Sequence, residues 1–258
     1  MNQQSRFLVN TFMNTTQPIT KIIAAFLLIV SVACGKANDN AYSTTPVVTP
    51  PSAYDTSMRY YLALGDSYTI GEAVEAGERY PVITEGILKS RGVVMADAEI
   101  IARTGWTTNN LQQVVSSTKF DHVYDVVTLL IGVNNQYQGG TLDVYASEFE
   151  MLLKKAIALT GGRADRVVVL SIPDYSVTPF GQRSNPAQIA NEIDQFNKVN
   201  KEISVKLNVQ YLDVTGDSRQ ALNESTYVAS DGLHFSGKMY RKWAEKLARL
   251  LTNMFEKK

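Results

Sequence analysis

The sequence predicts an α/β domain in which helices cover both faces of a parallel sheet of about five strands, a three-layer α/β/α sandwich. From residue 59 onward, short apolar runs alternate with stretches of helical periodicity. Most of the apolar runs are rich in Val, Ile and Leu without polar alternation, as in strands buried on both faces. Because alternating strands and helices favour a doubly wound domain, and 258 residues suit one such domain, we expect a single core.

Five apolar runs are the predicted strands, and five periodic stretches are the predicted helices between them. The strands are 60–64, 99–102, 126–131, 166–172 and 209–214. The helices are 81–90, 109–116, 143–159, one that Asn185-Pro186 opens, and a C-terminal one whose apolar face includes Trp243 and Leu247. The 25 basic and 25 acidic residues balance, so the charge gives no reason to expect a nucleic-acid partner.

The first 33 residues are predicted to be a targeting signal rather than part of the fold. Lys21 precedes an apolar segment, 22–30, that is short for a membrane span, and small residues follow it. This arrangement is typical of a secretory signal. Met13 would leave a more typical positively charged region before the apolar segment, so it is an alternative start.

Cys34, the only cysteine, lies where the end of this signal resembles the lipobox of bacterial lipoproteins. The resemblance rests on Ser31-Val32-Ala33-Cys34, although Ser31 stands where an aliphatic residue is preferred. It implies cleavage before Cys34, lipidation of Cys34 and a lipid anchor in the outer or inner membrane of the cell envelope. The alternative is a plain signal peptide, which would give a secreted or periplasmic protein. A single cysteine excludes a disulfide framework.

Residues 34–58 are predicted to be an unfolded tether between the anchor and a domain at 59–258. The segment is rich in Asn, Ser, Thr and Pro, and includes Thr45-Pro46-Val47-Val48-Thr49-Pro50-Pro51. Such a composition buries too little apolar surface to fold, and its prolines keep the chain extended.

The first predicted strand ends in Gly65-Asp66-Ser67, which places a hydroxyl at its carboxyl end. Ligands of open α/β sheets bind at the carboxyl ends of the strands, where a serine is well placed to act as a nucleophile. Asp and Ser are also ordinary helix caps, so these three residues alone are equally consistent with a turn before a helix.

Polar and glycine residues follow the other predicted strands. Gly105 lies after the second strand and Asn134 after the third, while Asp231 and His234 precede the last helix. Glycine and Asn are common turn formers, so each position is weak evidence by itself. We find no metal-ligand spacing and no glycine-rich phosphate loop, and therefore expect no metal and no cofactor.

Together these four blocks resemble those of the SGNH (GDSL) hydrolase family, in the same order along the domain. The resemblance implies a flavodoxin-like sheet order and ester hydrolysis through a serine acyl-enzyme. Ser67 would be the nucleophile, and His234 the base that Asp231 orients. The oxyanion hole would be formed by the amides of Ser67 and Gly105 and the side-chain amide of Asn134. The motif is not the G-x-S-x-G elbow of α/β-hydrolases, because Gly71 comes too late.

Neighbouring residues have other interpretations. Asp66 is adjacent to Ser67 and cannot easily reach the far side of the imidazole, so we expect it to bond the backbone of the turn. His122 precedes the third strand at the opposite edge of the sheet, where a surface or packing role is expected. Asn135 stands where many members of the family have Asp. Because Asn is uncharged, a contact that depends on a charge at this position is in doubt. Three aromatic residues flank these motifs, and the sequence is equally consistent with their lining the pocket or with ordinary packing: Tyr68, Trp106 and Tyr137.

The expected function is hydrolysis of an acyl ester. No long apolar loop follows Ser67, which together with surface tethering favours a short acyl group, such as an acetyl group carried by a glycan. Lysophospholipase or thioesterase activity is the alternative within the family. A non-catalytic ligand-binding or scaffold lipoprotein on the same fold is the alternative outside enzymes.

Overall fold

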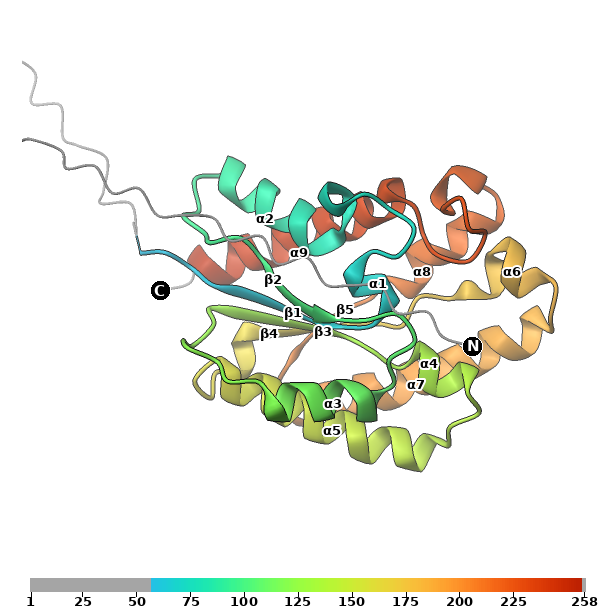
Figure 1. The fold of residues 1–258 in the computed structure, drawn as a ribbon, viewed down its shortest axis with the longest axis horizontal. Helices are drawn as coiled ribbons and strands as arrows, with labels where there is room; N and C mark the ends of the chain where they lie inside the picture. Colours follow the sequence, from blue (N-terminus) through green and yellow to red (C-terminus); the bar gives the residue numbers. More distant parts are fainter. Residues whose placement is uncertain (1–56, 257–258) are drawn as a thin grey trace, which may run out of the picture. The chain divides into compact units, whose positions relative to one another are not determined.

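The computed structural model describes residues 57–256, and these form a five-stranded, fully parallel sheet between two layers of helices (Figure 1). The predicted signal, Cys34 and most of the predicted tether lie outside the described residues. The sheet order is β2-β1-β3-β4-β5, which confirms the predicted flavodoxin-like arrangement. The strands are β1 Tyr61–Gly65, β2 Glu99–Ala102, β3 Val126–Leu130, β4 Val167–Leu170 and β5 Gln210–Leu212.

The continuous apolar pattern of the central strands reflects their burial on both faces. Every residue of β1, β3 and β4 is buried, whereas β2 and β5 are partly exposed because they lie at the sheet edges. β5 is shorter than predicted, since the Asp213 side chain accepts hydrogen bonds from the backbone of Thr215 and Gly216 and turns the chain.

Long helices cover each face of the sheet (Figure 1). α2 (Tyr80–Ser90) and α9 (Gly237–Glu256) pack together on one face. α3 (Thr108–Ser117), α5 (Leu142–Leu159) and α7 (Pro186–Lys206) cover the other. α7 begins as predicted, with the Asn185 side chain accepting from the Gln188 backbone at 3.2 Å and Pro186 in the first turn. No helix among residues 57–256 is long and apolar enough to cross a bilayer.

Several short helices were not predicted, and they connect the long elements at the strand ends. The short α-helices are α1 Ser67–Ile70, α4 Val133–Tyr137, α6 Pro179–Gln182 and α8 Thr215–Ser218. The 3₁₀ turns are Ala76–Glu78, Ala164–Arg166, Tyr175–Val177, Arg219–Leu222 and Ser225–Tyr227. A helix of one turn has no apolar periodicity for a sequence pattern to reveal.

The register of the sheet brings the predicted site blocks to one edge. Gly65 at the end of β1 pairs with Ala102 of β2 on one side and with Leu130 of β3 on the other. The segments that follow these three residues therefore begin side by side. They carry Ser67, Gly105 and Asn134.

Candidate active site

A tight turn between β1 and α1 presents Ser67. Asp66 caps α1, and its Oδ1 accepts a hydrogen bond from the Tyr68 backbone at 3.1 Å. Gly65 is required here, because a Cβ would lie 2.4 Å from the carbonyl oxygen of Leu130. As the first residue of a helix, Ser67 has a backbone N–H without an intrahelical partner. The turn thus offers both a hydroxyl and a free amide at the carboxyl edge of the sheet.

Asp231 and His234 are joined by three contacts within one turn. Oδ1 of Asp231 accepts from the backbone N–H groups of Leu233 and His234, each at 2.9 Å. Oδ2 lies 2.5 Å from Nδ1 of His234. Burial raises the pKa of Asp231, but the hydrogen bonds from His234 and from the two backbone groups outweigh it and leave that pKa below its usual value. A negative Asp231 therefore lies against the imidazole.

The predicted oxyanion donors lie across from this pair. Gly105 adopts φ +83°, a left-handed conformation that favours glycine, and nothing lies within 4 Å of its Cβ position. Asn134 is the second residue of α4 rather than a loop residue, and its Nδ2 donates one hydrogen bond to the carbonyl of Trp106 at 3.0 Å. Since an amide nitrogen has two hydrogens, the second remains for a substrate oxygen.

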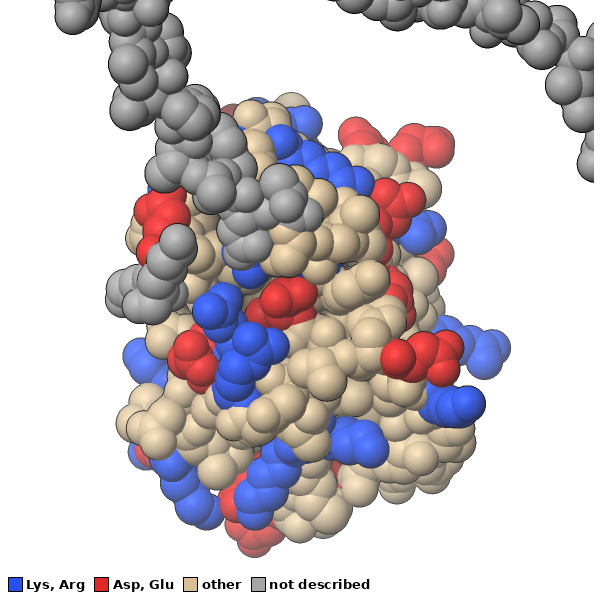
Figure 2. Space-filling view, turned by 90° about the vertical axis from the view of Figure 1, so that its left-hand side faces the viewer, with Lys and Arg blue, Asp and Glu red and all other residues tan. Residues whose placement is uncertain are grey.

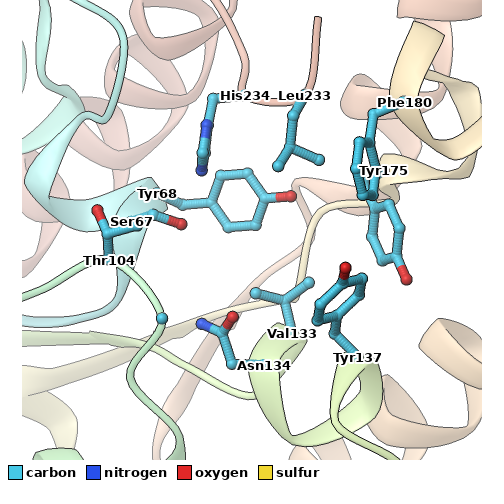
Figure 3. A pocket seen from close by; sticks show the side chains of 11 residues that line it. Ser67, Tyr68, Thr104, Val133, Asn134, Tyr137, Tyr175, Phe180, Leu233 and His234 are labelled. Atoms are coloured by element: carbon cyan, nitrogen blue, oxygen red, sulfur yellow. The ribbon is translucent and has the colours of Figure 1, made fainter. Parts of the chain in front are cut away.

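The four blocks meet at one cavity of about 240 Å³ (Figure 3). Ser67, His234, Gly105 and Asn134 all line it, while Asp231 stands behind the imidazole. Ser67 is only 5% exposed. The predicted residues Ser67, Gly105, Asn134 and His234 are thus brought together around one cavity.

The rest of the lining is mostly apolar and was predicted only in part. Tyr68 and Tyr137 line the cavity, whereas Trp106 does not and contributes its carbonyl to Asn134 instead. Lining residues that the sequence reasoning missed are Thr104, Val133, Tyr175, Phe180 and Leu233. Tyr175 and Phe180 follow β4, at the carboxyl edge where ligands of such sheets bind. Their position after a predicted strand could therefore have indicated that they line the pocket.

Asn135 is buried and fixes α4 to the start of α3 without a charged contact. Its Oδ1 accepts from the Thr108 backbone at 3.0 Å, and its Nδ2 donates to the Thr108 hydroxyl at 2.7 Å. That hydroxyl in turn donates to Glu148. Because a hydroxyl has a single hydrogen, the amide of Asn135 is what leaves the Thr108 hydrogen free for Glu148. The neighbouring Asn134 is thereby positioned.

His122 lies away from this cavity, at the other edge of the sheet. Its ring packs 4.0 Å from that of Tyr60, and its Nε2 lies 3.1 Å from the Glu99 carboxylate. The structure therefore gives His122 a packing role, as predicted.

Asp66 is fully buried, and burial raises its pKa to about 7, although backbone N–H groups of Tyr68, Asp66 and Gly132 lower it in part. A carboxyl with a raised folded-state pKa binds protons in the folded state that the unfolded chain has lost. We therefore expect the contribution of Asp66 to the free energy of unfolding to fall by about 3 kcal/mol as the pH rises from about 4 to 7.

The substitution Asp66→Asn should flatten this pH dependence, because Asn retains the helix cap and cannot titrate. Urea unfolding at several pH values measures it, with Asp97→Asn, an exposed carboxyl, as the control. An unchanged slope in the Asp66 variant would contradict the buried-carboxyl explanation.

Residues 63–242 match the model of the GDSL-like lipase/acylhydrolase family. A comparison with curated protein sequences found no match. Among solved structures, a lipase/acylhydrolase from Enterococcus faecalis is similar at 20% identity and a TM-score of 0.59, covering 76% of this chain and 96% of that one. An acetylxylan esterase from Geobacillus stearothermophilus is similar at 19% identity and a TM-score of 0.57, covering 78% and 95%.

A psychrotrophic esterase from Pseudoalteromonas sp. is similar at 15% identity and a TM-score of 0.56, covering 76% of this chain and 98% of that one. At these identities the solved structures support the fold, while the family model covers most of the domain. The chain belongs to the GDSL-like lipase/acylhydrolase family.

Proposed function

We propose that the protein is a serine esterase in which Ser67, His234 and Asp231 form the catalytic triad. The observation that carries this proposal is the shared cavity. Ser67 and His234 both line it, and Oδ2 of Asp231 lies 2.5 Å from Nδ1 of the His234 ring. The family match supports hydrolysis of an ester. No cofactor is required, because every group that the reaction needs is a side chain or a backbone amide.

The reaction begins when Ser67 Oγ attacks the ester carbonyl carbon while Nε2 of His234 takes the hydroxyl proton. Asp231 holds Nδ1–H and stabilises the imidazolium. The carbonyl oxygen becomes an oxyanion, which the amides of Ser67 and Gly105 and Nδ2 of Asn134 stabilise. Collapse expels the alcohol, and His234 protonates it.

The second half returns the enzyme to its starting state. His234 removes a proton from water, which attacks the acyl carbon of the Ser67 ester. The tetrahedral intermediate collapses, Oγ is reprotonated by His234, and the carboxylic acid leaves. The same oxyanion donors act in both halves of the reaction, so these protein groups keep their positions throughout.

We further infer that the acyl group is short, such as acetyl, and that the substrate is an acetylated glycan. The similarity to an acetylxylan esterase supports this class. The test is a series of nitrophenyl esters from acetate to palmitate, which should give the highest kcat/KM for acetate. A maximum at long chains would instead indicate the lysophospholipase or thioesterase alternative. Absence of turnover with every ester would favour a non-catalytic binding protein.

We also propose that the protein is a lipoprotein of the cell envelope, anchored through Cys34. The lipobox-like Ser31-Val32-Ala33-Cys34 segment supports the proposal, and it lies outside the described residues. Cys34→Ser should move the protein from the membrane fraction to the soluble fraction, because buried acyl chains contribute about 0.8 kcal/mol per CH₂. A variant that stays with the membrane would contradict acylation at Cys34.

A further inference from the structure

The Tyr68 side chain carries a polar group at the far end of the active-site cavity. Tyr68 lies next to Ser67 in the sequence, and its ring packs edge-on against the ring of His234, with centroids 5.8 Å apart. In Figure 3 the ring extends away from Ser67, and its hydroxyl points toward Leu233 and the aromatic side chains of Tyr175 and Phe180.

This hydroxyl has no hydrogen-bond partner within residues 57–256, although Tyr68 is only 2% exposed. Among the same residues, four other buried tyrosines are paired, whereas the Tyr240 hydroxyl, which does not line the cavity, is not. The partners of these four are Thr128 for Tyr61 and Tyr80, the Ile131 carbonyl for Tyr145, and Gln136 for Tyr175. Because Tyr68 lines the cavity, its unpaired hydroxyl can donate a hydrogen bond to a bound molecule or accept one from it.

The surroundings of the hydroxyl restrict what that molecule is. Rings of Tyr137, Tyr175 and Phe180 lie within 6.2–6.4 Å of one another, centroid to centroid, and form an aromatic wall. Tyr137 is 60% exposed, so this wall reaches the mouth of the cavity. The face of an aromatic ring has a partial negative charge, balanced by a positive edge, and attracts the polarised C–H groups of a saturated ring. A sugar ring offers such C–H groups together with hydroxyls.

An acetyl group alone leaves most of a 240 Å³ cavity for the alcohol part of the ester. The leaving alcohol must lie near His234, which protonates it, and the Tyr68 ring packs against His234. Tyr68 therefore forms the wall on the side of the leaving group.

We propose that the Tyr68 hydroxyl is a specificity-determining group that hydrogen-bonds a hydroxyl of the leaving alcohol, so that the enzyme selects acyl esters of sugars or similar cyclic polyols. The inference rests on the proposed esterase function. Burial raises the pKa of Tyr68, which keeps the hydroxyl protonated and able to donate.

The experiment compares two acetyl esters of a secondary alcohol on the same six-membered ring. One is a mono-O-acetylated methyl pentopyranoside, and the other is tetrahydropyran-4-yl acetate, which lacks hydroxyls. Released acetate gives kcat/KM for each. The wild-type protein should prefer the hydroxylated ring, and Tyr68→Phe should lower the preference by about tenfold or more. The matched control is Tyr240→Phe, which removes an unpartnered tyrosine hydroxyl that does not line the cavity and should leave the preference unchanged.

Nitrophenyl acetate separates failure of this inference from failure of the esterase proposal. Hydrolysis of nitrophenyl acetate without a preference for the hydroxylated ring, or an unchanged preference in Tyr68→Phe, would overturn the role of Tyr68 alone. No hydrolysis of any of the three esters would overturn both. Should Tyr68→Phe not fold, the wild-type ratio decides, and a preference for the ring without hydroxyls would overturn the inference.

Discussion

Replacing Ser67 by Ala is expected to lower kcat for nitrophenyl acetate by about 10⁵–10⁶-fold, the loss typical when a triad nucleophile is removed. The variant keeps the backbone amides and Asn134, so residual activity reflects oxyanion stabilisation alone. The fold should be unaffected, because the cap of α1 comes from Asp66 and the Ser67 backbone is retained. Initial-rate kinetics with purified protein measure the effect.

The matched control for this result is Ser117→Ala. Ser117 is exposed at the end of α3, and its hydroxyl donates only to the Val114 carbonyl within the same helix. Wild-type activity in this control and its loss in Ser67→Ala would locate the chemistry at Ser67. Comparable activity in both variants would contradict the triad.

Replacing Asp231 by Asn is expected to lower kcat by about 10³–10⁴-fold. The change is confined to one atom, because an Asn Oδ1 can still accept from the Leu233 and His234 backbone at the 2.9 Å positions. Only the partner of Nδ1 differs. An amide there donates to Nδ1 instead of accepting from it, so the proton is placed on Nε2 and the imidazole cannot act as a base toward Ser67.

Asp213→Asn is the control for this variant. Asp213 also accepts from two backbone N–H groups in a turn at the carboxyl edge of the sheet, but it faces no histidine. Its substitution should leave kcat unchanged. If Asp231→Asn retained full activity while circular dichroism showed a native fold, His234 would need another orienting group.

The sheet and the position of the candidate site were predictable because both depend on local sequence patterns: the apolar runs of the strands and the residues that follow them. Runs such as Val126-Val127 are apolar because the strand is buried on both faces, and that burial is visible in the sequence. The parallel order then places Ser67, Gly105 and Asn134 at one edge without further information. Asp231 and His234 are three residues apart, so their contact is local as well.

The pocket wall was less predictable because it depends on long-range packing. Trp106 and Tyr137 both follow strand ends, yet only Tyr137 lines the cavity, since the Trp106 backbone turns to accept from Asn134. Phe180 reaches the cavity through α6, a one-turn helix whose backbone bonds to Gly232 near His234. Such a contact joins segments about fifty residues apart and leaves no pattern in either one.

Covalent labelling tests the central claim, that Ser67 is the nucleophile, most directly. The wild-type protein is incubated with a fluorophosphonate, digested and examined by mass spectrometry. The proposed mechanism predicts one phosphonyl adduct on the Ser67 side chain, abolished in Ser67→Ala and strongly slowed in Asp231→Asn. A protein that hydrolyses nitrophenyl acetate but carries its adduct on a residue other than Ser67 would contradict it.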